Sequence, residues 1–121
     1  MTSPLASSTR WLDATAQAEL VATGETTAAE LVEAAIERIE AFDAPLNSVV
    51  IRWYDDARVA AADVDGRLAR GVAVPEFAGV PTLLKDLWAH SVGHPMTNGN
   101  AGLCAEMPIS TYDTTLVARF R

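Results

Sequence analysis

The chain has 121 residues, of which 50% are hydrophobic and 21% charged, a composition typical of one folded domain rather than a disordered segment. Its formal net charge of -7 argues against nucleic acid or an anionic membrane as a partner, because both repel a negative surface. The single cysteine, Cys104, allows no disulfide within the chain, and neither a signal peptide nor a membrane-spanning apolar run is visible. We therefore expect a cytoplasmic protein.

Helix signals dominate the first part of the chain. Residues 1–10 are expected to form a flexible leader. Asp13 is a suitable N-cap for a first helix, which Gly24 would end. The segment Thr27–Glu30 is a capping box and predicts a second helix with apolar residues at helical spacing. That helix should end before Pro45, because the residue preceding a proline avoids the helical region.

A strand and a third helix are expected next. Residues 47–53 are rich in β-branched and aromatic side chains and predict a strand or extended segment. Residues 54–70 predict a helix that Gly71 closes. Its four carboxylates are interpreted as a solvated face rather than as a catalytic pair: Asp55, Asp56, Asp63 and Asp65.

The segment Gly79–Asp86 is a short apolar run that ends in Lys85. Its length and composition predict a strand, with Lys85 where the strand leaves the core. A lysine whose stem lies in apolar surroundings loses its proton easily and can act as a base. The alternative is a surface lysine with Asp86 as its partner.

The pattern changes after Asp86. Residues 87–103 predict a long loop of small and polar residues, and such loops in compact domains are often functional. Residues 104–111 are expected to be irregular. Asp113 can cap a last, short helix. The apolar side of such a helix needs a packing partner such as a strand, and no strand follows it within the chain. We therefore expect residues 11–121 to be the N-terminal portion of a larger domain.

The remaining reactive side chains form no recognisable site. His90 and His94 flank a glycine and precede a proline, so they are interpreted as loop residues, and no metal site is predicted. Cys104 is interpreted as a small buried residue. No serine lies in a glycine-rich turn that could present a nucleophilic hydroxyl beside backbone N–H donors. No cofactor is expected.

In the order and the amino-acid sequence of its segments the chain resembles the amidase signature family. Phe77–Asp86 matches the motif G-[IV]-P-x-x-[IVL]-K-D of that family. Further similar segments are Asp13–Gly24, Glu30–Ile39, Leu46–Val50 and Asp113–Arg121. Within the family the sequence of these segments is most similar to amidases of the 6-aminohexanoate-cyclic-dimer hydrolase type.

The resemblance implies an α/β fold in which helices sandwich a mixed central sheet, and an amide hydrolase with a Ser–cis-Ser–Lys triad. Lys85 matches the triad lysine, whereas both serines of the family lie in a downstream Ser- and Gly-rich segment that this chain does not include. The fragment alone is therefore expected to be inactive. Thr97, Asn98 and Gly99 are the candidate substrate-binding residues, or else they shape the loop backbone.

Two further interpretations stay open. One is the glutamine-hydrolysing amidotransferase subunit, which shares the motif and works with partner subunits. The other is a non-catalytic fragment or a degenerate relative.

Met96 and Asn100 replace a threonine and a serine found in many relatives, which bears on substrate preference. The expected partner is a small-molecule amide substrate, with a homodimer as the expected assembly of the full-length protein.

Overall fold

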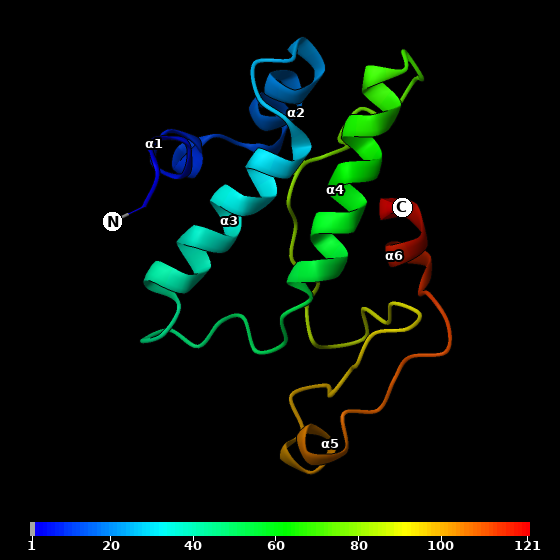
Figure 1. The fold of residues 1–121 in the computed structure, drawn as a ribbon. Helices are drawn as coiled ribbons and strands as arrows, with labels where there is room; N and C mark the ends of the chain where they lie inside the picture. The colour runs from blue at the N-terminus through cyan, green and yellow to red at the C-terminus, as the bar shows by residue number, and fades with distance from the viewer. Residues whose placement is uncertain (1) are drawn as a thin grey trace. The chain divides into compact units, whose positions relative to one another are not determined.

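The computed structural model describes residues 2–121, and its regular elements are helices (Figure 1). The unit that ends at Pro81 contains α1 (Pro4–Ser8), the 3-10 turn η1 (Thr9–Trp11), α2 (Ala14–Thr23), α3 (Ala28–Phe42) and α4 (Tyr54–Ala69). The unit from Thr82 to Arg121 contains α5 (Ala101–Glu106) and α6 (Thr115–Phe120). Along the described residues no helix is long and apolar enough to cross a membrane.

The predicted caps of α2 and α3 are confirmed. The Asp13 side chain accepts a hydrogen bond from the Ala16 N–H at 2.8 Å, and Gly24 ends α2 with a left-handed φ of 75°. At the start of α3, Thr27 Oγ1 accepts from the Glu30 N–H at 3.1 Å, and a Glu30 carboxylate oxygen accepts from the Thr27 N–H at 2.8 Å. These bonds satisfy N–H groups that a helix start leaves without partners.

Helices α3 and α4 lie side by side and bury a shared apolar cluster (Figure 1). The cluster comprises Ala28, Val32, Ile36 and Ala61. The small side chains of Ala28 and Ala61 occupy little space, which allows the two helices to approach closely. The predicted helix over residues 54–70 is confirmed to within one residue of its end.

One of the four carboxylates of α4 is not part of a solvated face. The two carboxylate oxygens of Asp65 accept hydrogen bonds from the N–H groups of Ala28 and Ala29 at 2.8 and 3.0 Å. Asp65 therefore caps the start of α3 from a neighbouring helix, at a position that favours an anion. Asp55, Asp56 and Asp63 are exposed, as expected.

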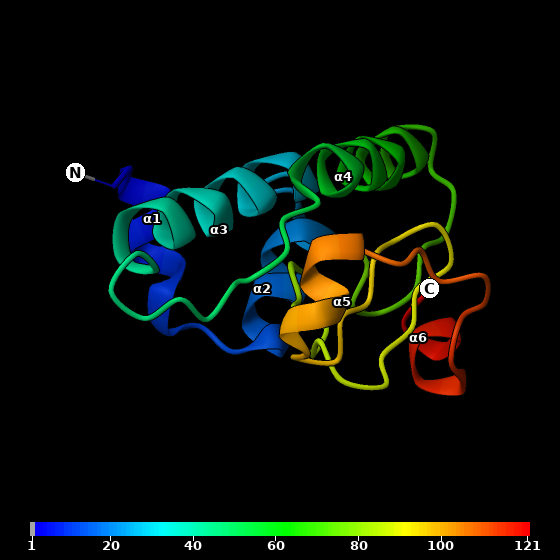
Figure 2. The ribbon, with the colours of Figure 1, turned by 90° about the horizontal axis from the view of Figure 1, so that it is seen from below.

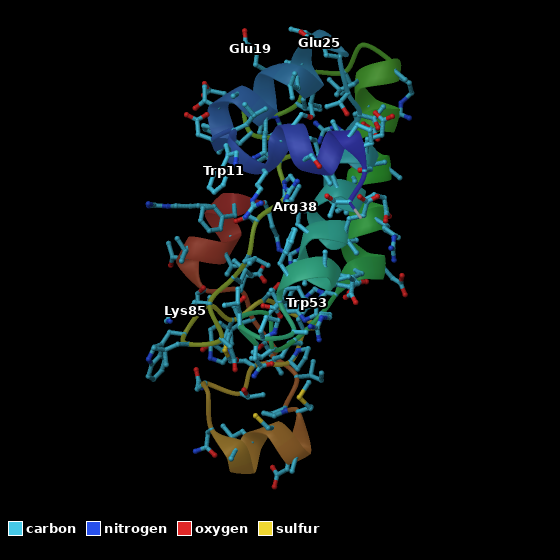
Figure 3. All side chains as sticks on the ribbon, turned by 90° about the vertical axis from the view of Figure 1, so that its left-hand side faces the viewer. Trp11, Glu19, Glu25, Arg38, Trp53 and Lys85 are labelled. Atoms are coloured by element: carbon cyan, nitrogen blue, oxygen red, sulfur yellow. The ribbon has the colours of Figure 1, made fainter. Side chains whose placement is uncertain are left out.

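The expected flexible leader contains α1, which packs against α3 (Figure 2). Ser3 caps α1, and its N–H donates to a Glu37 carboxylate oxygen at 2.8 Å. The Arg38 guanidinium donates to the Ala6 carbonyl at 3.1 Å and to Thr9 Oγ1 at 2.8 Å (Figure 3). The partners lie about thirty residues away in α3, so the leader could not be recognised as helical from its own ten residues.

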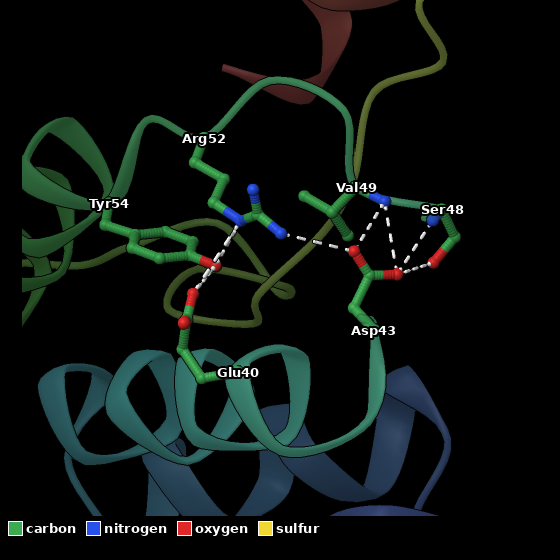
Figure 4. Close-up of polar contacts among 6 residues, drawn as sticks. All are labelled: Glu40, Asp43, Ser48, Val49, Arg52 and Tyr54. Atoms are coloured by element: carbon green, nitrogen blue, oxygen red, sulfur yellow. Dashed lines mark hydrogen bonds and ion pairs between the residues drawn. The ribbon is translucent and has the colours of Figure 1, made fainter. Parts of the chain in front are cut away.

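The segment after α3, where residues 47–53 were expected to form a strand or extended segment, contains no strand. The buried Asp43 carboxylate holds this segment in place by hydrogen bonds (Figure 4). It accepts them from the Ser48 N–H at 2.8 Å, from the Ser48 hydroxyl and from the Val49 N–H at 3.2 Å. Arg52 approaches the same carboxylate at 3.4 Å. The hydrogen bond from the Ser48 side chain lowers the pKa of Asp43 most, and the backbone N–H groups and Arg52 lower it further against the effect of burial. A side chain thus supplies the bonds that a neighbouring strand would supply in a sheet.

The central sheet implied by the resemblance is not confirmed. Throughout residues 2–121 no strand forms, and an isolated bridge joins Pro95 to Ile109. The run at Gly79–Asp86, expected as a strand, begins and ends in turns and has no regular structure between them. A strand exists only where a second strand pairs with its backbone, and these residues have no such partner within the described part of the chain.

The second unit has its own small core. Ala89, Met96 and Val117 are buried together, and Leu84 packs against them. The expected irregular stretch after residue 100 contains α5, and Cys104 within it is exposed rather than buried.

Asp113 does not cap α6 as predicted. Its carboxylate accepts from the Val92 N–H at 2.7 Å and pairs with Arg121 at 3.0 Å. Thr114 takes the N-cap position of α6, without a capping bond from its side chain.

Candidate functional site

The lysine motif begins with a glycine that lies in the first unit, close to the start of α3. Gly79 has a left-handed φ of 87°, and a Cβ placed on it would lie 2.7 Å from the Ala28 Cβ. Both observations favour glycine at this position, since any side chain meets an unfavourable backbone conformation and a close neighbour.

Lys85 lies on an irregular segment of the second unit, with its side chain exposed (Figure 3). The expected strand end with a buried lysine stem is therefore wrong for the described residues. Leu83 is 65% exposed, whereas Leu84 packs against the core of the second unit. The apolar surroundings that a neutral lysine requires are not provided by residues 2–121.

Asp86, the residue after Lys85, accepts four hydrogen bonds through its carboxylate. One carboxylate oxygen accepts from the Thr97 N–H at 2.7 Å and from the Asn98 N–H at 3.1 Å. The other accepts from the Thr97 hydroxyl and from the Gly99 N–H at 3.2 Å. We call this arrangement of Asp86 with residues 97–99 the Asp86 clamp.

The clamp favours an ionised carboxylate. Partial burial acts to raise the pKa of Asp86, but the hydrogen bonds from Thr97, Gly99 and Asn98 outweigh it and hold that pKa below its ordinary value. Hydrogen bonds to a carboxylate are stronger than those between neutral groups, so the ionised clamp fixes the two segments together.

Two non-glycine residues in or next to the clamp have left-handed backbones. Trp88 has a φ of 63° and Asn98 a φ of 51°. Asn98 adopts this region readily, whereas a bulky residue such as tryptophan seldom does. The Trp88 N–H donates to the Asn98 side-chain oxygen at 3.1 Å, which gives the two segments a second connection beside the clamp. The Trp88 side chain is 71% exposed.

The predicted substrate-binding residues lie together in the clamp. The N–H groups of Thr97, Asn98 and Gly99 all point to Asp86, which corresponds to the alternative that they shape the loop backbone. Nothing in the sequence pattern singled out Asp86 as their acceptor. The partners are 11 to 13 residues apart, so no local signal could have revealed the clamp.

The two departures from the usual family loop also have structural roles. Met96 is buried in the second core, and Asn100 caps α5 by accepting from the Gly102 and Leu103 N–H groups at 2.8 and 3.3 Å. The Met96 side chain is buried, whereas the Asn100 side chain is exposed and its oxygen forms the cap.

Two serine–histidine contacts were missed by the sequence reasoning. Ser91 Oγ lies 3.1 Å from His94 Nδ1, and Ser110 Oγ lies 3.0 Å from His90 Nδ1. Both serines are buried, so their hydroxyls are closed to a substrate, and the contacts hold the loop together. No group of three or more potential metal ligands occurs among the described residues.

The profile of the amidase family matches residues 30–121, which include the lysine motif and the clamp. This chain belongs to the amidase family. The resemblance inferred from the sequence is confirmed. The family match begins inside α3, so it leaves out α1, η1 and α2 and covers the rest of the first unit and all of the second.

Individual amidases resemble the chain over most of its length. It is 40% identical over 111 residues to the 6-aminohexanoate-cyclic-dimer hydrolase of Pseudomonas sp. (strain NK87), covering 92% of the chain and 21% of that protein. It is 37% identical over 110 residues to a glutamyl-tRNA(Gln) amidotransferase subunit of Renibacterium salmoninarum, covering 91% of the chain and 21% of that protein. The chain thus spans about a fifth of the length of the curated relatives it matches.

A solved structure supports the fold. The crystal structure of a bacterial aryl acylamidase belonging to the amidase signature enzymes family matches with a TM-score of 0.71 at 44% sequence identity. The match covers 74% of the chain and 18% of the aryl acylamidase chain. The amidase chain described here is therefore consistent with the amidase signature fold, of which it shows helices and loops.

Proposed function

We propose that this amidase chain is the N-terminal part of an amide hydrolase and supplies its catalytic lysine, Lys85. The observation that carries the proposal is the family match over residues 30–121, within which Gly79–Asp86 reproduces the lysine motif. The Asp86 clamp adds support, because it holds the residue next to Lys85 by four hydrogen bonds.

The proposed reaction uses two serines that lie outside the 121 residues. Neutral Lys85 accepts a proton from a bridging serine, which in turn accepts the proton of the nucleophilic serine. The nucleophile forms a bond to the amide carbon, the carbon–nitrogen bond breaks, and the amine leaves with a proton. Water then cleaves the acyl-enzyme, releasing the acid and restoring the serine.

Burial of Lys85 by the remainder of the protein is part of this proposal. A lysine must be neutral to accept a proton, and desolvation is the effect that lowers a lysine pKa. Because Lys85 is exposed within residues 2–121 and no serine partner is supplied, we propose that these residues alone hydrolyse no amide.

The test is amide hydrolysis by the full-length gene product and its Lys85→Ala variant. Suitable probes are a chromogenic anilide, a cyclic or linear 6-aminohexanoate amide, and glutamine. Loss of the base should lower kcat by about 100-fold or more. Lys85→Arg, which keeps a cation but not a usable base, should be as inactive. Full activity of Lys85→Ala on every amide cleaved would exclude this role for Lys85.

A second candidate is the glutamine-hydrolysing subunit of an amidotransferase. It is favoured by the 37% identity to a subunit of a glutamyl-tRNA(Gln) amidotransferase. Glutaminase activity that depends on co-purifying partner subunits would support it. Hydrolysis of anilides or 6-aminohexanoate amides by the protein without partners would support the first candidate instead.

A further inference from the structure

The backbone on both sides of Lys85 is held in place. On one side Leu84 packs against the buried cluster of Ala89, Met96 and Val117. On the other side the carboxylate of Asp86 accepts the four hydrogen bonds of the clamp. Consecutive Cα atoms are about 3.8 Å apart, so fixing these two neighbours fixes the position from which the lysine side chain starts.

The short segment of residues 96–99 takes part in both restraints. Met96 belongs to the cluster that contacts Leu84, and the three residues that follow it form the clamp with Asp86. A displacement of residues 96–99 would therefore open the clamp and remove one member of the cluster that contacts Leu84.

The left-handed backbones strengthen this interpretation. A bulky residue with a left-handed backbone is energetically unfavourable and persists only where the surroundings impose it. Trp88, two residues beyond Asp86, is held this way while it donates to the side chain of Asn98, itself left-handed. The segment that follows the lysine is thus fixed against its own conformational preference.

We propose that Asp86 is a positioning residue for Lys85, which acts by fixing the lysine-bearing backbone against residues 97–99. The inference rests on the proposed function, since it assigns a purpose to the clamp only if Lys85 is the base. Asp86 touches neither substrate nor the reacting atoms in this arrangement. A misplacement of a catalytic group by about 1 Å can cost about 100-fold in rate, so the clamp has a measurable catalytic consequence.

The decisive variant is Asp86→Asn in the full-length enzyme, assayed with whichever amide probe it cleaves. The asparagine keeps the size of the side chain but replaces one acceptor oxygen with an N–H donor facing the donors of residues 97–99. We expect kcat per active site to fall about 10- to 100-fold with KM changed less than about threefold. Active sites are counted as folded enzyme, measured by near-UV circular dichroism, so that unfolded enzyme does not enter the rate.

Asp113→Asn is the matched control. Asp113 also lies in the second unit and also accepts a backbone N–H, from Val92 at 2.7 Å, but it does not adjoin the lysine. Its kcat per active site should stay within about twofold of the unsubstituted enzyme. If both asparagine variants lower kcat per active site equally, the effect is general to the unit and the inference fails.

A milder pair of variants covers the case in which Asp86→Asn does not fold. Thr97→Val removes the hydroxyl donor but keeps all three backbone donors, and should lower kcat per active site about 3- to 10-fold. Thr97→Ser restores the hydroxyl and should restore the rate. The acidic limb of the pH profile of kcat, which reports the base, should shift in Asp86→Asn and Thr97→Val but not in Thr97→Ser or Asp113→Asn.

The outcomes separate this inference from the proposed function. Inactive Lys85→Ala together with unchanged kcat and pH profile in Asp86→Asn and Thr97→Val would overturn the role of Asp86 alone. Full activity of Lys85→Ala would overturn both. Loss of kcat and a shifted pH profile in the two clamp variants, with the controls unaffected, supports both.

Discussion

The first unit contains α3 and α4, of 15 and 16 residues, which bury apolar side chains against each other. The second unit contains two helices of six residues and is held by hydrogen bonds to Asp86 and Asp113 around a small apolar cluster. Helices as short as α5 and α6 are marginal without packing. The difference suggests that the first unit serves stability, whereas the second places individual groups, Lys85 among them.

The largest expected effect tests the packing of the first unit. Leu31 on α3 is 1% exposed, so Leu31→Ala should lower the free energy of unfolding by about 2–5 kcal/mol. Val59 on α4 is 71% exposed, and Val59→Ala should change it by less than about 0.5 kcal/mol. Chemical denaturation of the two variants measures both. Equal effects would show that the apolar interior of α3 does not dominate this unit.

A smaller effect is expected from the cap that α4 supplies to α3. Asp65→Ala removes the acceptor of the Ala28 and Ala29 N–H groups and should cost about 1 kcal/mol of unfolding free energy. Asp63→Ala on the same helix removes an exposed carboxylate of the same charge and should be close to neutral. Indistinguishable denaturation midpoints for the two variants would argue against capping by Asp65.

The smallest effect is expected from acid, and it concerns the second unit. Because the pKa of Asp86 lies below its ordinary value of 3.8, the clamp contributes its full stability above that pH and loses it as the pH falls through the lowered pKa. The amide protons of Thr97, Asn98 and Gly99 should therefore shift together in NMR spectra recorded below about pH 3.8. In Asp86→Asn this common shift should vanish, and its persistence would assign the titration to another group.

The same contrast explains what could be predicted from the sequence. The starts of α2 and α3 are set by side chains within three residues of the backbone they cap, such as Asp13 and Glu30, and these predictions were confirmed. The clamp, the Asp65 cap and the contacts of α1 join residues from 11 to 37 positions apart, and nothing in a local pattern indicates such pairs. These features were missed.

The lysine motif was found for a different reason. Its residue sequence matched the lysine motif of the amidase signature family, although the strand predicted for it did not form within the described residues. A strand depends on pairing with another segment, so composition alone could indicate an apolar extended run but not its partner. The identity of Lys85 as a candidate base could therefore be inferred, whereas its surroundings could not.

The exposed thiol of Cys104 has a practical use. It is the only cysteine of the 121 residues, and it lies on α5, which starts directly after the clamp and is capped by Asn100. A maleimide fluorophore or spin label attached there would report the motion of residues 97–99 from one defined position. The spectrum of such a label should broaden or sharpen when the clamp opens, which makes this loop accessible to spectroscopy without adding a cysteine to these residues.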